Sequence, residues 1–205
     1  MFEYRWFTDF VYLATVLNPF NLVPVFLHVT EHLTPKARRT TARRAVVIAA
    51  AILIGFVVLG QSLLDALGIG LPSFSIGGGL VLLAVALQRI LAPANVSAEE
   101  KVGSSLDRAR DVAVFPLATP HIAGPGAIVA VVLLTDNEEF GIVEQALTTL
   151  IMLAILAFLY AVLLGASTVH RLLGTTGADV LDRISALVLA ALAMDTIIEG
   201  IHASF

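Results

Sequence analysis

The sequence predicts an all-α integral membrane protein that crosses the bilayer six times. Of the 205 residues, 58% are hydrophobic and 14% are charged, and the mean hydropathy is +0.93. A soluble domain of this size could not bury so much apolar surface, so lipid is the expected solvent. Six continuously apolar stretches are each long enough to cross a hydrocarbon core of about 30 Å as a helix, and too long for a membrane β-strand.

The predicted spans follow one another along a single polytopic domain, residues 1–205. They are placed at 6–29, 45–64, 71–91, 112–135, 142–167 and 181–203. The segments between them are polar and too short to fold as separate domains. The opening residues, MFEYRWFTDF, lack the basic region of a signal peptide, and no small-residue cleavage site follows, so we expect span 1 to be retained.

The basic residues predict the orientation of the spans. Every Lys and Arg except Arg5 lies on one side, in or beside the connections after spans 1, 3 and 5. These residues are Lys36, Arg38, Arg39, Arg43, Arg44, Arg89, Lys101, Arg108, Arg110, Arg171 and Arg183. By the positive-inside rule, that side is cytoplasmic and both termini lie outside the cytoplasm.

This topology makes any internal repeat an inverted one, because spans 1–3 and spans 4–6 cross the membrane with opposite sense. We predict repeat A near 6–91 and repeat B near 112–203, joined by a cytoplasmic loop near 92–111. The third spans of the two repeats align without a gap, GGLVLLAVALQ over SALVLAALAMD. This alignment sets Gln88 opposite Asp195.

Matching proline pairs predict that spans 1 and 4 are broken helices. Pro19 and Pro24 in NPFNLVP have the same spacing as Pro120 and Pro125 in TPHIAGP. A proline removes a backbone donor and clashes with the preceding turn, so it frees polar backbone groups. In hydrocarbon such groups persist only where protein or a polar cavity supplies partners. Neighbouring helices alone could satisfy one kink, but two breaks in oppositely oriented halves favour a solute site near the midplane.

The residues around the two breaks suit a small zwitterion. Where span 4 resumes its helix, at Gly124, Pro125 and Gly126, free amides and the helix dipole can hold a carboxylate. Carbonyls near 18–21 can receive an ammonium group or a coupling cation. The predicted solute-binding residues are Asn18, Pro19, Asn21, Pro24, Thr119, Pro120, His121, Gly124, Pro125 and Gly126. Hydrogen bonding between helices is the alternative role for the asparagines, and a neutral, hydrogen-bonded state is the alternative to gating by protonation for His121.

Three further residues are predicted to act in coupling or gating. Asp195 lies well inside span 6, and burying its charge near the membrane centre is costly. The neutral form is favoured there, which would let Asp195 carry a proton. Glu199 follows on the same helix face, and Gln88 is the partner of Asp195 in the repeat. A structural hydrogen bond for Asp195 and solvation at the outer interface for Glu199 are the alternatives.

Several classes of function are disfavoured. The chain has no cysteine, which excludes a disulfide framework, a thiol nucleophile and a thiolate metal site. No phosphate-binding loop, zinc-ligand spacing or Ser–His–acid set is present, so we expect no enzymatic activity, no metal and no cofactor beyond a coupling ion, H⁺ or Na⁺. The net charge of −4 gives no basic surplus for nucleic acid. The expected partners are a small-molecule solute and the lipid bilayer, and a homo-oligomer stays open.

At these residues the sequence resembles the MarC family of six-helix bacterial inner-membrane proteins. The resemblance covers essentially the whole chain and rests on NPFNLVPVFL, IGGGLVLL, PLATPHIAGPGAI and RISALVLAALAMDTIIEGI. It implies a polytopic protein of a bacterial-type inner (plasma) membrane that transports small neutral amino acids such as glycine or alanine. Relatives commonly carry amides at the positions of Asp195 and Glu199. The carboxylates of this sequence depart from that pattern, so its substrate and its coupling ion can differ from those of the relatives.

The function that we predict is secondary transport of small neutral amino acids, or of similar small polar solutes, by alternating access between the two breaks. A channel would use the same breaks as a filter. A membrane-embedded enzyme would have to build its chemistry on Asp195, Glu199 and His202, the only polar trio on one helix. A structural or regulatory membrane protein is the remaining alternative.

Overall fold

The computed structural model describes residues 2–91, 112–137 and 140–205, and all regular elements in these ranges are helices. In chain order they are α1 (Phe2–Leu17), α2 (Leu22–Val29), α3 (Pro35–Leu67), α4 (Leu71–Leu91), η1 (Ala113–Ile122), α6 (Pro125–Leu134), α7 (Ile142–Leu164) and α8 (Ala166–Ser204). The predicted cytoplasmic loop near 92–111, with its three basic residues, lies outside the described residues. The predicted all-α class is confirmed for the described part of the chain.

The lengths and apolar character of these helices fit membrane spans. Five continuous stretches qualify, and η1 followed by α6, bent by 53°, makes a sixth if the pair counts as one span. The five are Arg5–Val29, Pro35–Leu67, Leu71–Leu91, Ile142–Leu164 and Thr176–Ser204. Each overlaps one predicted span, because a long apolar run is the strongest signal that a membrane sequence carries.

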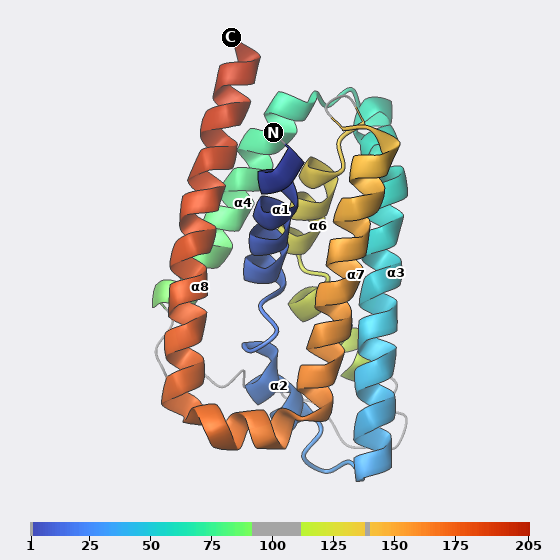
Figure 1. Cartoon of the computed structure of the whole chain (residues 1–205), viewed down its shortest axis with the longest axis vertical. Helices are drawn as coiled ribbons and strands as arrows, with labels where there is room; N and C mark the ends of the chain where they lie inside the picture. Colours follow the sequence, from blue (N-terminus) through green and yellow to red (C-terminus); the bar gives the residue numbers. More distant parts are fainter. Residues whose placement is uncertain (1, 92–111, 138–139) are drawn as a thin grey trace.

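The helices form one elongated bundle with the short helices at its centre (Figure 1). In this view α1 and α6 lie between α4 and α8 on one side and α3 and α7 on the other. α4 packs along α8, and α3 packs against α7, η1 and α6. Both termini lie at the same end of the bundle.

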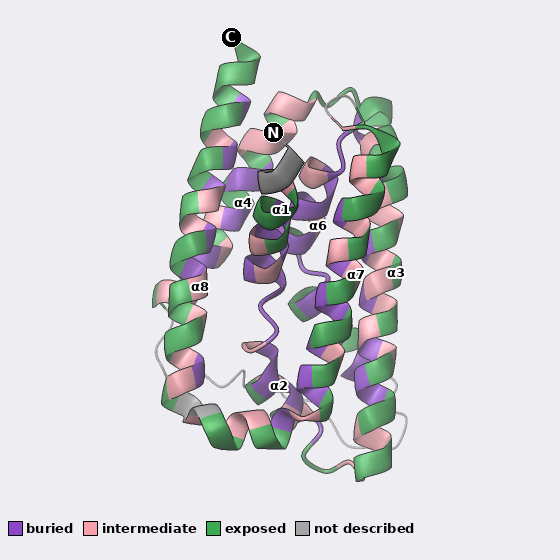
Figure 2. Cartoon of the chain, viewed as in Figure 1, coloured by how far each residue is buried: buried purple, intermediate pink, exposed green. Residues whose placement is uncertain are grey.

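Burial follows this arrangement. The central segments are mostly buried, whereas α3, α4, α7 and α8 expose much of their outward faces (Figure 2). The exposed side chains on these faces include large apolar ones such as Val58, Leu59, Leu150 and Leu187, each more than 60% exposed. Apolar surface on this scale is unfavourable in water and favourable against lipid tails, so the outer helices shield the central ones from lipid.

The second span begins earlier than the sequence predicts. α3 starts at Pro35 rather than at 45, so the basic residues of the predicted first loop form its opening turns. Thr34 caps the helix by accepting a hydrogen bond from the Ala37 amide at 3.3 Å, and Pro35 suits the first helical position. Hydropathy marks only the apolar part of a helix, and these polar turns extend beyond it.

The fifth and sixth spans also differ at their ends. α7 ends at Leu164 rather than at 167, and α8 begins at Ala166 rather than at 181. The backbone of Gly174 has φ 64°, a left-handed value that favours glycine, and it bends α8 there. The turns before Gly174 lie across the end of the bundle opposite the termini, and the remainder of α8 runs along the bundle (Figure 1).

Two glycines of α4 allow close approach of its neighbours. A Cβ on Gly78 would overlap Val129 of α6, and a Cβ on Gly79 would lie 3.0 Å from the Ala193 carbonyl oxygen of α8. Small residues are the usual means by which membrane helices come into close contact. These glycines therefore set α4 directly against α6 and α8.

Candidate functional site

The first helix ends just before the first proline of the NPFNLVP segment. α1 ends at Leu17, and Asn18 has φ 33°, a positive value that asparagine tolerates better than most residues. The Asn18 amide donates to the Ala14 carbonyl at 3.0 Å, and the Asn21 amide donates to the Asn18 carbonyl at 3.2 Å. The chain thus makes a hydrogen-bonded turn before α2 begins.

An arginine from α4 reaches the carbonyls at the end of α1. The Arg89 guanidinium donates to the Thr15 carbonyl oxygen at 3.4 Å and to the Val16 carbonyl oxygen at 3.5 Å. The last carbonyls of a helix have no partner within it and carry the negative end of its dipole, so a cation there is favourable. Arg89 therefore stabilises the point at which α1 stops.

Asp182 of α8 completes this network. Its Oδ1 accepts a hydrogen bond from Asn18 Nδ2 at 2.7 Å and lies 3.9 Å from Arg89 Nε. Asn18 is buried, and the side chains of Arg89 and Asp182 are 17% and 18% exposed. The network joins α1 and α4, from the first half of the sequence, to α8, from the second half.

The second interrupted segment lies between η1 and α6. Inside η1 the backbone is extended at Phe115 and at Thr119. A regular helix resumes at Pro125, where the first bond runs from the Ile128 amide to the Gly124 carbonyl at 3.0 Å. The first amides of α6 therefore have no acceptor within the helix and point toward its start.

The start of α6 lies against the end of α1. A Cβ on Gly126 would lie 3.7 Å from Val16 Cγ1 and 3.1 Å from Leu82 Cδ2, so only a very small residue fits without displacement. A Cβ on Gly124 would overlap the Pro120 carbonyl oxygen. The positive end of one short helix and the negative end of the other are thus neighbours, and glycine permits that approach.

Comparison with known proteins decides the family. The model described as MarC family integral membrane protein matches residues 4–205. The chain belongs to the MarC family. The resemblance inferred from the sequence motifs is therefore confirmed.

Relatives match this MarC family chain over nearly its whole length. A UPF0056 membrane protein of Methanocaldococcus jannaschii is 35% identical, with 93% of this chain and 92% of the relative covered. Another, of Aquifex aeolicus, is 34% identical over 94% and 90%. The inner membrane protein YhgN of Escherichia coli is 28% identical over 94% and 93%. No solved structure matches.

The other predicted binding residues of the MarC family chain lie around the breaks. Pro19 is buried in the turn after α1, Asn21 and Thr119 are half-buried, and the remaining prolines are exposed: Pro24, Pro120 and Pro125. His121 is exposed, and its Nδ1 lies 2.9 Å from the Pro116 carbonyl oxygen. This contact within η1 accounts for one ring nitrogen, and the role of His121 in solute binding stays a prediction.

The predicted coupling residues lie on the outer helices. Gln88, Asp195 and Glu199 are exposed on α4 and α8. The residue after Asp195, Thr196, is buried, and its Oγ1 lies 3.2 Å from the hydroxyl oxygen of Tyr12 on α1. The coupling role of the three predicted residues stays a prediction.

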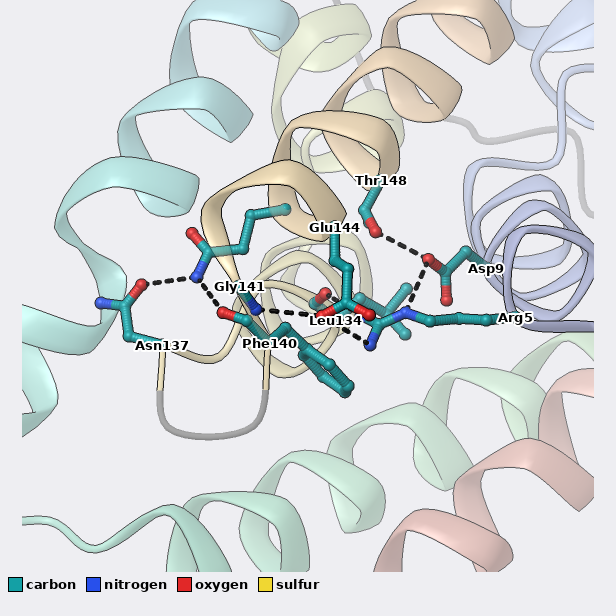
Figure 3. Close-up of polar contacts among 9 residues, drawn as sticks. Arg5, Asp9, Leu134, Asn137, Phe140, Gly141, Glu144 and Thr148 are labelled. Carbon is teal, nitrogen blue, oxygen red and sulfur yellow. Dashed lines mark hydrogen bonds and ion pairs between the residues drawn. The ribbon is translucent and has the colours of Figure 1, made fainter. Parts of the chain in front are cut away.

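A second polar network, which was not predicted from the sequence, lies where α1, α6 and α7 meet (Figure 3). Asp9 of α1 is 3% exposed, and its Oδ2 accepts a hydrogen bond from Thr148 Oγ1 of α7 at 2.6 Å. The same oxygen lies 3.7 Å from Arg5 Nε. Arg5 also donates to the Leu134 carbonyl oxygen at 3.3 Å and lies 4.0 Å from the Glu144 carboxylate. This network ties α1 to α6 and α7.

Part of this second signal was present in the sequence. Arg5 and Asp9 are four residues apart, a spacing that pairs charges on one helix face. Asp9 is also an acidic residue inside the predicted span 6–29. Arg89 contributed only to the orientation, and Asp182 had no signal apart from its place near the start of span 6.

Proposed function

We propose that this MarC family protein is a secondary transporter of small neutral amino acids such as glycine or alanine, or of similar small polar solutes, by alternating access. The observation that carries the proposal is the packing of α1 against α6, where a Cβ on Gly126 would lie 3.7 Å from Val16 Cγ1. Two interrupted helices that pack together supply backbone carbonyls at one end and free amides at the other, the groups that a zwitterion needs.

The proposed solute lies between the two breaks. Its carboxylate binds the amides of Gly124, Gly126 and Ala127 at the start of α6, where the helix dipole is positive. Its ammonium group lies toward the turn at 18–21 that follows α1. The side chains of Asn18, Asn21 and Thr119 add hydrogen bonds.

Helix packing supports the inverted repeat that alternating access requires. The pair α1 and α2 packs against α7 and α8 of the other half, and the pair η1 and α6 packs against α3 and α4. In the predicted repeat, α1 and α2 correspond to η1 and α6, while α3 and α4 correspond to α7 and α8. The two sets of contacts are therefore equivalent, as expected for repeats related by an axis in the membrane plane. A repeat of this kind gives the protein two equivalent arrangements, one open to each side.

The ends of the inner short helices support the same relation. α2 is followed by Thr30 and α6 by Thr135, both buried. Each hydroxyl donates to the carbonyl four residues earlier, at 2.6 Å and 2.7 Å. An acidic residue follows each threonine, Glu31 in one half and Asp136 in the other.

The proposed setting is a bacterial-type inner (plasma) membrane, with both termini outside the cytoplasm. The printed name of the YhgN relative supports the inner membrane. The basic residues at the start of α3 and those that flank α4 and α8 support the orientation. H⁺ and Na⁺ are the proposed coupling ions, and no enzymatic activity is part of this function.

Flux measurements test the proposal. Purified protein in proteoliposomes is expected to give saturable uptake of radiolabelled glycine or alanine under an imposed proton or sodium gradient. Liposomes without protein provide the baseline. Absence of saturable flux for every small amino acid, across several proton and sodium gradients, would contradict the proposal.

A further inference from the structure

A loose ion pair joins the two halves of the chain beside the break in α1. Arg89 Nε and Asp182 Oδ1 are 3.9 Å apart, and both side chains are partly exposed. A direct hydrogen bond between a guanidinium and a carboxylate is about 2.7–2.9 Å long. Each side chain of the Arg89–Asp182 pair can therefore form a shorter hydrogen bond with an entering charged group than it forms with the other.

The other contacts of Arg89 are also long. Its hydrogen bonds to the carbonyl oxygens of Thr15 and Val16 measure 3.4 Å and 3.5 Å, at the limit for such bonds. A guanidinium has five N–H donors in a planar fork and binds carboxylates best when two of them act together. Arg89 thus retains the capacity to take a second carboxylate at little cost.

We propose that the Arg89–Asp182 pair recognises both charges of a zwitterionic solute: Asp182 binds the ammonium group and Arg89 binds the carboxylate. The inference rests on the proposed transport function and deepens it, because it names the side chains that set the substrate class. Solute entry exchanges one internal ion pair for two pairs with the solute.

Charge balance explains the selectivity that this arrangement gives. The pair is neutral as a unit, and a zwitterion is neutral as well, so the occupied site carries no net charge. A solute with a carboxylate alone, or with an ammonium group alone, would leave one charge of the pair without a partner in a partly buried place, which is costly. The site therefore rejects singly charged analogues of the same size.

The position of the pair agrees with the site between the two breaks. Arg89 contacts the last turn of α1 from α4, and Gly126 at the start of α6 lies beside the same turn, where an added Cβ would be 3.7 Å from Val16 Cγ1. The guanidinium and the positive end of α6 flank this turn, so both can face one carboxylate. Asn18, which binds Asp182 Oδ1 at 2.7 Å, holds the carboxylate of Asp182 at the break.

Titration calorimetry of the purified protein tests the inference with three probes: glycine, acetate and methylamine. The parent protein is expected to bind glycine, and to bind acetate and methylamine at least about tenfold more weakly, because each leaves one charge unpaired. The Asp182→Asn and Arg89→Gln variants are each expected to bind glycine at least about tenfold more weakly.

Two further variants serve as controls. Asp182→Glu keeps the carboxylate and is expected to retain the preference for glycine over acetate. Asp179→Asn removes a carboxylate one turn earlier on α8 and is expected to bind glycine as the parent does. Circular dichroism and gel filtration establish that each variant is folded. The relative affinities of the parent protein for the three probes test the inference even if a variant fails to fold.

The outcomes separate this inference from the proposed function. Glycine flux in the parent, combined with equal affinity for acetate and glycine or with undiminished glycine binding by Asp182→Asn, overturns the inference and leaves transport intact. Absence of both glycine binding and amino acid flux in the parent overturns transport and the inference with it.

Discussion

At the scale of single residues, one buried carboxylate in this apolar bundle is matched to a partner from another helix. The Asp9 carboxylate on α1 is 3% exposed and is held by Thr148 of α7 and by Arg5. A buried carboxylate without partners is strongly unfavourable. The hydrogen bond from the Thr148 hydroxyl to Asp9 is therefore expected to stabilise the folded protein.

Replacing Thr148 with valine tests this contact. Thr148→Val keeps the shape of the side chain and removes the donor to Asp9, so we expect a loss of about 1–3 kcal/mol in the free energy of unfolding. Reversible unfolding in mixed micelles measures the loss. The control is Thr149→Val, since Thr149 donates only within its own helix, to the Gln145 carbonyl at 2.7 Å. Equal stability of the two variants would contradict the role given to Thr148.

Adjacent glycines of α4 provide a second test at this scale. A Cβ on Gly78 would overlap Val129, whose branched side chain has little freedom to move, whereas a Cβ on Gly77 has nothing within 4 Å. Gly78→Ala is expected to destabilise the protein by about 1–3 kcal/mol through overpacking. Gly77→Ala is expected to be neutral or slightly stabilising, because alanine favours the helix. Thermal unfolding in detergent measures both variants, and equal melting temperatures would contradict this packing.

At the scale of helices, the sequence predicted the apolar spans but not the polar contacts between them. Long apolar runs and prolines act locally, so each can be found from a short window. The Asn18–Asp182 and Asp9–Thr148 bonds join residues 164 and 139 positions apart, which no local pattern records. The start of α3 at Pro35 was missed for a different reason, since its first turns are polar and hydropathy treats them as a loop.

The end of α2 offers a test at the scale of helices. Arg38 of α3 donates to the Thr30 carbonyl at 2.8 Å and to the Glu31 carbonyl at 3.0 Å, so it caps α2. Arg38→Gln is expected to cost about 1 kcal/mol, because the charge at the C-terminal end of the helix is lost. The exposed neighbour Arg39 supplies the control, Arg39→Gln. A larger loss of stability in the control than in Arg38→Gln, measured by the same unfolding experiment, would argue against the cap.

At the scale of the whole molecule, the two halves surround a centre made from the interrupted helices, and apolar surface faces outward. The termini share one end, and the basic start of α3 lies at the other (Figure 1). By the positive-inside rule, this separation of charge predicts that the end with the start of α3 is cytoplasmic.

Cysteine labelling tests that orientation, and the absence of native cysteines makes each introduced thiol unique. In intact cells a membrane-impermeant maleimide is expected to label Phe205→Cys at the C-terminus. Lys36→Cys, at the start of α3, is expected to react only after the cells are permeabilised. The reverse pattern would place both termini in the cytoplasm.

The central claim is that one solute binds both breaks, and hydrogen–deuterium exchange of the unmodified protein tests it most directly. Saturating glycine is expected to slow exchange together at the non-proline amides of 18–21 and of 124–127, and to leave the amides of 36–44 unchanged. Slowing in one break alone, or in neither, would contradict the account.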